Sequence, residues 1–214
     1  MNKVVLYDYW RSSASYRVRI ALNLADIPYE TVAVDLLAGS HKSQEYLAVN
    51  PQGFVPTLIM DGRKLTQSLA IVEYIAESRP GCGLLPESPA ERQRVRALSY
   101  AIAMDIHPIC NMHVAAHVVD LLGKPEAREE WMRHFILDGL RKVNEMLSEN
   151  PSQFCQGDRP TMADLCLIPQ MYNAHRWGLN LEALRRITAV EARCSALTAF
   201  QQAHPDRAIR PSGA

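Results

Sequence analysis

The chain has 214 residues, 48% of them hydrophobic, which is enough to bury a sizeable core as one large domain or two small ones. Its 23 lysines and arginines balance its 23 aspartates and glutamates, and the absence of a block rich in basic residues argues against a nucleic-acid partner. The apolar runs are too short to span a membrane and the start lacks a signal-peptide pattern, so we expect a cytoplasmic protein that binds small molecules or a second copy of itself.

The first segment combines two predicted strands with one predicted helix. The strands cover residues 3–8 and 29–36, and the helix covers residues 14–25. A strand, a helix and a strand within about thirty residues predict a parallel pair of strands joined by a crossover.

Three serines stand where the first strand turns into the helix: Ser12, Ser13 and Ser15. Their hydroxyls and the unpaired backbone N–H groups lie at the positive end of a helix, a place that suits an anion. The alternative, in which one of these serines is only the N-cap of the helix, stays open on the local sequence.

The next segment predicts a hairpin. A polar and weakly helical stretch over residues 39–49 leads through a turn at 50–53 to a strand over 54–60. The turn at 61–62 and a short return strand over 64–66 follow.

Two features of this segment concern binding. Pro56 is either an ordinary residue at the start of a strand or part of a cis Val55–Pro56 bond that leaves the Val55 backbone free to pair with an extended peptide. Gln67 and Ser68 open a helix that runs to about Ser78, so polar residues again meet a helix start.

The proline- and glycine-rich residues 79–89 form the best candidate linker, and every later segment has helical period. The predicted helices cover 88–119 with a bend at Pro108, 126–149, 161–172 and 181–203. Capping boxes are predicted at Ser88/Glu91 and Thr161/Asp164. The apolar face of the 126–149 helix is expected to consist of Trp131, Phe135, Leu140, Val143, Met146 and Leu147.

We therefore predict an α/β domain followed by an all-α domain. Residues 1–80 form the mixed sheet with its helices, residues 81–87 form the linker, and residues 88–214 form the helical domain. An active site between the two domains is the natural expectation. The five scattered cysteines contain no C-x-x-C pair and are expected to be buried apolar residues rather than disulfides or metal ligands.

The stretch Ser12-Ser13-Ala14-Ser15-Tyr16-Arg17-Val18-Arg19-Ile20 resembles the signature of the zeta-class glutathione transferases, whose usual form is S-S-C-S-[WH]-R-V-R-I. Val55-Pro56, Gln67-Ser68 and Thr161-Met162-Ala163-Asp164-Leu165 also match this family at its spacing, and the similarity runs from about Val4 to His204. The resemblance implies a thioredoxin-like domain that binds glutathione, followed by a helical domain that carries the substrate site. One departure is Ala14, which replaces the family's cysteine, so that the reacting sulfur must belong to glutathione.

Members of this family are maleylacetoacetate isomerases, and close bacterial relatives isomerise maleylpyruvate. The resemblance therefore implies a cis–trans isomerase in which the thiolate of glutathione adds reversibly to the double bond. Three alternatives remain: a maleylpyruvate isomerase, a glutathione transferase acting on α-halo acids, and a non-catalytic glutathione-binding module. The resemblance also implies a homodimer.

The family positions imply roles for individual residues. Ser12 donates to the thiolate with support from Ser13 and the next backbone N–H groups, at Ala14 and Ser15, while Val55, beside Pro56, pairs with the cysteinyl backbone. Gln67 and Ser68 hold the γ-glutamyl carboxylate, His41 lies near the glycyl end, and His107 and Asn111 lie at the mouth of the helical domain.

Arginines are expected in the pocket because the substrates are dianions and a guanidinium matches carboxylate geometry. Arg11 and Arg176 are the candidates. Arg17 and Arg19 are expected to be structural, one facing solvent and the other in an internal ion pair. A solvated helix face is expected for Arg92, Arg94 and Arg96.

Overall fold

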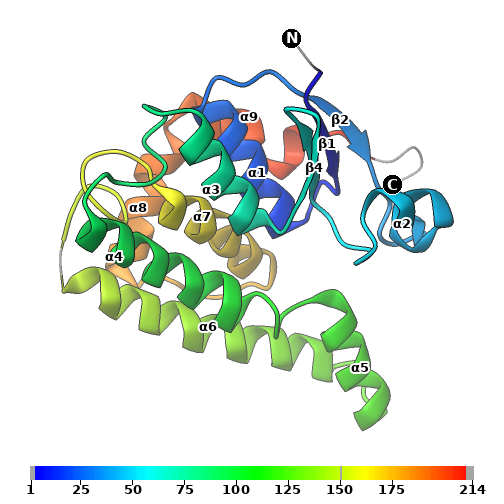
Figure 1. Ribbon diagram of the computed structural model, residues 1–214. Helices are drawn as coiled ribbons and strands as arrows, with labels where there is room; N and C mark the ends of the chain where they lie inside the picture. Colours follow the sequence, from blue (N-terminus) through cyan, green and yellow to red (C-terminus); the bar gives the residue numbers. More distant parts are fainter. Residues whose placement is uncertain (1–2, 150, 211–214) are drawn as a thin grey trace. The chain divides into compact units, whose positions relative to one another are not determined.

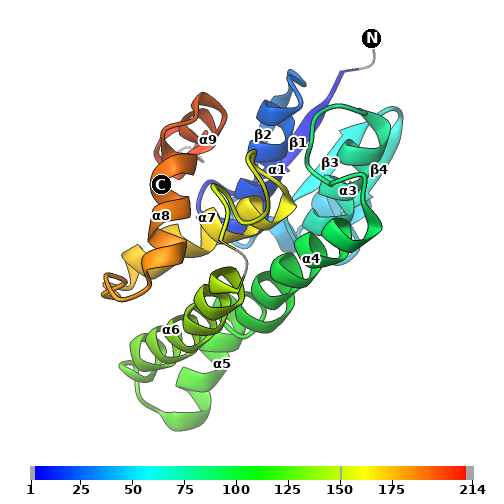
Figure 2. The same cartoon turned by 90° about the vertical axis from the view of Figure 1, so that its left-hand side faces the viewer.

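The computed structural model describes residues 3–149 and 151–210, and its contacts divide the chain into two compact units. Unit 1 contains the residues up to Leu84 and those from Leu197 onward, and unit 2 is Leu85–Ala196. The sequence-based division placed all residues from 88 onward in one helical domain, whereas the contacts assign the last helix to unit 1. The elements are labelled in Figures 1 and 2.

Unit 1 is built on a four-stranded mixed sheet with the order β2-β1-β3-β4. The strands are β1 (Val5–Asp8), β2 (Glu30–Ala33), β3 (Thr57–Met60) and β4 (Arg63–Thr66). The β1 and β2 strands are parallel, as the crossover predicted, and the other pairs are antiparallel. The predicted Asp61-Gly62 turn joins β3 to β4, with φ of 52° and 74° at its two residues.

The helices of unit 1 are α1 (Ser13–Leu24), α2 (Gln44–Val49), α3 (Ser68–Ser78) and α9 (Thr198–Ala203), with 3-10 turns at Ser40–Lys42 and Pro205–Arg207. The α1 helix packs against both α3 and α9. Side chains alternate along β1: Leu6 and Asp8 are buried, and Asp8 faces Arg19 of α1. Tyr7 points to the other face, where its ring lies 5.9 Å from that of Tyr46 in α2. Both faces of the sheet are therefore covered.

Unit 2 is helical in all its described elements. They are α4 (Pro89–Tyr100), a π-helical segment η2 (Ala101–Ile106), α5 (Met112–Leu122), α6 (Ala127–Ser148), α7 (Met162–Arg176) and α8 (Arg185–Ser195). The α7 helix packs against α4, and α8 packs against α6 and α7. No helix in the described ranges is long and apolar enough to cross a membrane.

Two predicted helices are broken in the structure. The prediction of one bent helix over 88–119 is wrong, because the chain leaves helical geometry between His107 and Asn111, around Pro108, which has no N–H to donate. The prediction of one helix over 181–203 is also wrong. The α8 helix ends at Ser195 and the α9 helix begins at Thr198, and the two helices belong to different units.

The capping predictions have different outcomes. Ser88 is the N-cap of α4 with Pro89 at the first helical position, but its side chain makes no capping hydrogen bond. The second capping box is confirmed, since the Asp164 carboxylate accepts from the Thr161 N–H at 2.8 Å and from its hydroxyl at 3.0 Å.

The buried stripe of α6 is shifted from the predicted one. Leu140, Val143 and Leu147 are buried as predicted, but Met132 and Ile136 complete the stripe in place of their neighbours Trp131 and Phe135. The buried residues are spaced four, four, three and four apart, which is one helix face. Because indoles carry a polar edge, Trp131 stays half-buried and donates to the Ile109 carbonyl at 3.0 Å.

All five cysteines are free thiols, and four of them are buried as predicted, whereas the prediction is wrong for Cys82, which is only partly buried. Burial raises the pKa of Cys110 to about 11. A thiol that stays protonated is not a nucleophile at neutral pH.

Candidate active site

The first candidate feature is the start of α1. Ser12 is its N-cap, with extended backbone, and the Ser12 Oγ accepts from the Ser15 N–H at 3.2 Å. A hydroxyl that accepts one hydrogen bond still has its own hydrogen to donate. Ser12 can therefore cap the helix and donate to an anion at once, so the two interpretations of the serines do not compete.

The rest of the first turn also favours an anion. No acidic residue lies there. Among the described residues, the N–H groups of Ser13 and Ala14 have no hydrogen-bond acceptor. The side chain of Ser15 is fully buried, so it faces the protein interior. The polar groups offered at this helix end thus include the Ser12 hydroxyl and two backbone N–H groups, with the partly buried Ser13 hydroxyl beside them.

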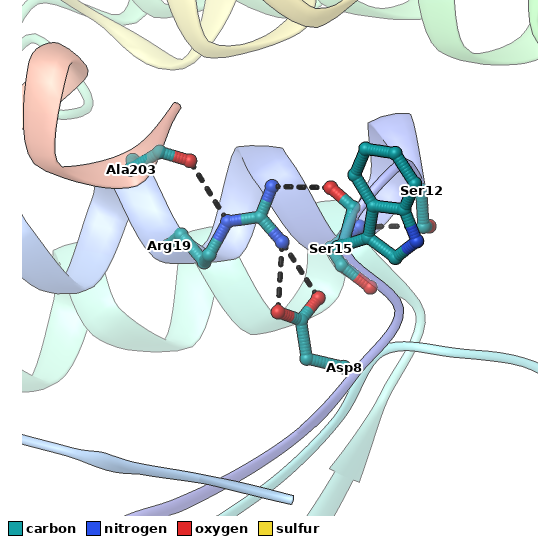
Figure 3. A network of polar contacts seen from close by, with 6 residues as sticks. Asp8, Ser12, Ser15, Arg19 and Ala203 are labelled. Atoms are coloured by element: carbon teal, nitrogen blue, oxygen red, sulfur yellow. Dashed lines mark hydrogen bonds and ion pairs between the residues drawn. The ribbon is translucent and has the colours of Figure 1, made fainter. Parts of the chain in front are cut away.

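Arg19 fixes the position of this helix (Figure 3). Its Nη1 lies 2.7 and 2.8 Å from the two carboxylate oxygens of Asp8, and both side chains are buried. Its Nη2 donates to the Trp10 carbonyl at 3.1 Å, and its Nε donates to the Ala203 carbonyl at 2.9 Å. This is the predicted internal ion pair, and it joins α1 to β1, to the loop before Ser12 and to α9.

Arg17 links α1 to the second polar helix start. The prediction that one of the two arginines faces solvent is wrong, since both are 2% exposed. Arg17 and Arg19 are about 200° apart around the helix axis, so they leave opposite sides of α1. Arg17 Nη1 donates to the Ser68 hydroxyl at 3.2 Å, and Ser68 is the first residue of α3. A buried cation therefore lies at the N-terminus of α3.

The Val55–Pro56 peptide bond is cis, as the sharper of the two sequence interpretations predicted. The carbonyl just before it, that of Phe54, accepts from the Tyr46 hydroxyl at 2.6 Å and from Asn50 Nδ2 at 2.8 Å. The backbone N–H and C=O of Val55 have no hydrogen-bond partner among the described residues. They are therefore available to an extended peptide.

Gln67 and His41 are the two remaining predicted glutathione-binding residues of unit 1. Gln67 has a φ of 65° and is exposed, with its Nε2 donating to Gln52 Oε1 at 3.1 Å. The His41 ring is partly buried, and its Nδ1 has no partner among the described residues. Burial, aided by the neighbouring charge of Lys42, lowers the pKa of His41, so the neutral ring is favoured at neutral pH.

The remaining candidates divide between the units. Arg11, in unit 1, donates from Nη2 to the Tyr9 hydroxyl at 3.2 Å, and its guanidinium lies 4.5 Å from the Trp10 ring centroid. Arg11, Ser12, Val55 and Ser68 thus all belong to unit 1. Three candidates belong to unit 2: His107 after η2, Asn111 at the N-cap of α5, and the exposed Arg176 at the end of α7.

Sequence reasoning missed one cation at this site. The guanidinium of Arg210 lies 4.3 Å from the Trp10 ring centroid. Because 200 positions separate the two residues, no local pattern connects them. A contact of this kind depends on the path of the chain after α9.

Known proteins resemble this chain over nearly its whole length. The family model "Glutathione S-transferase, N-terminal domain" matches residues 2–77. Maleylacetoacetate isomerase of Rhizobium meliloti (strain 1021) is 61% identical and covers 97% of this chain and 98% of its own length.

Solved structures agree with these matches. A bacterial zeta-class maleyl pyruvate isomerase in its holo form has a TM-score of 0.93 at 39% identity, with 98% of this chain and all of that chain covered. A maleylacetoacetate isomerase from Methylobacterium extorquens AM1, with bound malonate and glutathione, has a TM-score of 0.92 at 41% identity, covering 97% of this chain and 100% of that one. The chain is thus similar to isomerases, and the second of these structures holds glutathione.

Proposed function

The chain belongs to the zeta-class glutathione transferase family together with the maleylacetoacetate isomerases, and we propose that it converts maleylacetoacetate to fumarylacetoacetate with glutathione as cofactor. The observation that carries the proposal is the Ser12 hydroxyl, which caps α1 and still has a proton to donate. When bound, glutathione supplies a thiolate that adds reversibly to the cis double bond and lets the bond rotate.

The polar groups of unit 1 fit this cofactor. A thiolate needs hydrogen-bond donors, and the start of α1 offers the Ser12 hydroxyl with two N–H groups. A peptide backbone needs an extended partner, which the free Val55 backbone next to Pro56 offers. A carboxylate needs positive charge, and the N-terminus of α3 combines Ser68 with the buried guanidinium of Arg17. Gln67 and His41 complete the set.

The stabilisation that Ser12 and the start of α1 can give a thiolate is large enough to lower the pKa of the glutathione thiol. Lowering the pKa of a thiol from about 8.5 by about 2 units requires about 2.7 kcal/mol in favour of the anion. One hydrogen bond to a charged group contributes about 1.5–3 kcal/mol, and a helix N-terminus contributes about 0.3–1 kcal/mol. Ser12 and the start of α1 together are of the required size, so no general base is needed.

The substrate is a dianion, and we assign Arg11 and Arg176 to its carboxylates because guanidinium groups stay charged and bind carboxylates with two hydrogen bonds. His107 and Asn111 are assigned to the mouth of the site. The proposed division of labour is glutathione binding by residues 1–80, a linker at 81–87, and substrate binding by the helical residues after it.

A direct assay tests the proposal. Purified protein should isomerise maleylacetoacetate only when glutathione is present. The Ser12→Ala variant should lose about 100-fold in kcat/KM, the equivalent of about 2.7 kcal/mol. Ser12→Thr, which keeps a hydroxyl and a capping oxygen, is the matched control and should retain most of the activity. Turnover without glutathione would refute the mechanism.

Maleylpyruvate is the second candidate substrate, because the structure with the TM-score of 0.93 is that of a maleyl pyruvate isomerase. The ratio of kcat/KM for the two substrates, measured on one preparation, decides between them. The relatives favour neither a transferase acting on α-halo acids nor a non-catalytic binding module.

We also propose that the protein acts as a homodimer in the cytoplasm, in the degradation of tyrosine and other aromatic compounds. The family resemblance supports these assignments. Sedimentation of the purified protein tests the dimer, since a mass near 24.0 kDa would indicate a monomer instead.

A further inference from the structure

The segment after Leu197 runs back along α1, from the end of that helix toward its start. In Figure 1, α9 lies beside α1. The contacts follow one another in opposite order on the two segments. Asn23 Nδ2 donates to the Ala199 carbonyl at 2.9 Å, and Arg19 Nε donates to the Ala203 carbonyl at 2.9 Å. Further along, the Tyr16 ring meets the His204 ring edge-on at 6.2 Å, and Trp10 contacts Arg210. The segment thereby brings a cation to the residues just before Ser12.

Trp10 holds two cations at once. The guanidinium of Arg11 lies 4.5 Å from its ring centroid and that of Arg210 lies 4.3 Å away, so the two groups are within about 9 Å of each other. Contact with an aromatic ring orients a guanidinium while leaving its N–H edge available for hydrogen bonds. Two positive charges held this close favour an anion beside them.

The carboxylate of Asp206 also faces Arg210, but at a long distance. Asp206 Oδ1 lies 3.8 Å from Arg210 Nη2, beyond hydrogen-bond distance, and both side chains are about half exposed or more. Arg11 Nη2 donates a hydrogen bond to the Tyr9 hydroxyl. Among the described residues, the one ion pair of these two guanidinium groups is therefore the long, exposed contact of Arg210 with Asp206.

We propose that Arg210 is a substrate-binding residue, which together with Arg11 binds one carboxylate of the dianionic substrate. This inference rests on the proposed function and adds a residue to that site. The carboxylates of glutathione are assigned to the start of α3 and to the region of His41, so the cations at Trp10 are left for the substrate. Trp10 is two residues before Ser12 in the chain, and under the proposed function this assigns the substrate carboxylate to the same end of α1 as the thiolate.

The experiment compares Arg210→Gln with Arg207→Gln. Arg207 is the matched control because it lies in the same segment, is exposed, and its side chain has no ion pair or hydrogen bond among the described residues. Arg210→Gln should raise the KM for maleylacetoacetate about ten-fold, as expected for a charge-assisted hydrogen bond at a half-exposed site. Arg207→Gln should leave it unchanged, and Arg210→Lys, which keeps the charge, should give an intermediate value.

A role in supporting α1 would give a different result. Substrate binding by Arg210 leaves the KM for glutathione and the ultraviolet absorbance of the bound thiolate as in the unmodified protein. A change in either for Arg210→Gln, or equal KM values for the two glutamine variants, would overturn the inference.

Malonate binding separates this inference from the proposed function. If the unmodified protein lacks isomerase activity, the proposed function fails, and calorimetric titration of the glutathione-loaded protein with malonate still tests Arg210. A Kd raised about ten-fold in Arg210→Gln, and unchanged in Arg207→Gln, supports a carboxylate site. Equal affinities, or no malonate binding at all, would overturn it.

Discussion

Replacement of Arg19 with methionine is expected to destabilise the protein severely. The substitution keeps an unbranched side chain but removes the cation that Asp8 contacts at 2.7 and 2.8 Å, while the Asp8 carboxylate stays 1% exposed. Removing one partner of a buried ion pair costs about 3–5 kcal/mol, because the remaining charge has neither water nor a counter-ion. The carbonyls of Trp10 and Ala203 lose donors as well. We therefore expect a loss of about 4 kcal/mol, against a total stability of about 5–15 kcal/mol for a typical domain.

Equilibrium urea unfolding, followed by circular dichroism, measures this loss. The double variant Asp8→Leu with Arg19→Met should recover about half of it or more, because the uncompensated charge is gone. Lys142→Met is the matched control: its ammonium lies 2.7 Å from Asp138, but both side chains are at least half exposed, so the unfolding curve should not move. A loss below about 1 kcal/mol for Arg19→Met, or a double variant no more stable than the single one, would contradict the assignment.

Three shorter predictions concern other sites. Asp164→Asn should cost about 2–3 kcal/mol in urea unfolding, because the new amide group faces N–H donors that the carboxylate now satisfies, and a change within error would refute the capping role. Gly139→Ala, although alanine favours helices, should destabilise by about 1–3 kcal/mol, because the added Cβ would come 2.3 Å from Ile106 Cγ1; a gain in stability would show that Ile106 moves aside. The pKa of His41 is lowered on folding, so the unfolded state binds the proton more tightly and the free energy of unfolding should fall as pH decreases below about 6.5. His41→Gln should remove that part of the pH dependence. Equal curves of stability against pH for the two proteins would contradict this expectation.

Periodicity located the elements of the sheet and most helices, because their signals are local. Alternation and a turn of Asp61 and Gly62 are enough to define the β3–β4 hairpin, and an apolar helical repeat is enough for α1. The breaks were not visible in the same way. Pro108 predicted a bend but not a full break, and residues 196–197 contain neither proline nor glycine, so packing decides that the second helix ends there.

The site was predictable where the chemistry belongs to one short motif. Ser12 at a helix start follows from neighbouring residues, and the cis bond before Pro56 was one of two local alternatives; the structure has both. The burial of Arg17 depends on α3, which is more than forty residues away in the chain. The contact of Arg210 with Trp10 depends on the path of α9. A single sequence carries no signal for contacts of either kind.

The return of residues 197–210 to α1 has a consequence for biosynthesis. The Asp8–Arg19 pair is completed by a carbonyl from position 203, which leaves the ribosome long after the sheet has been made. Unit 2, by contrast, is one continuous stretch of chain. The nascent protein should therefore finish the later-made helical unit first, and the thioredoxin-like unit should become protease-resistant only after residues 197–210 have left the ribosome.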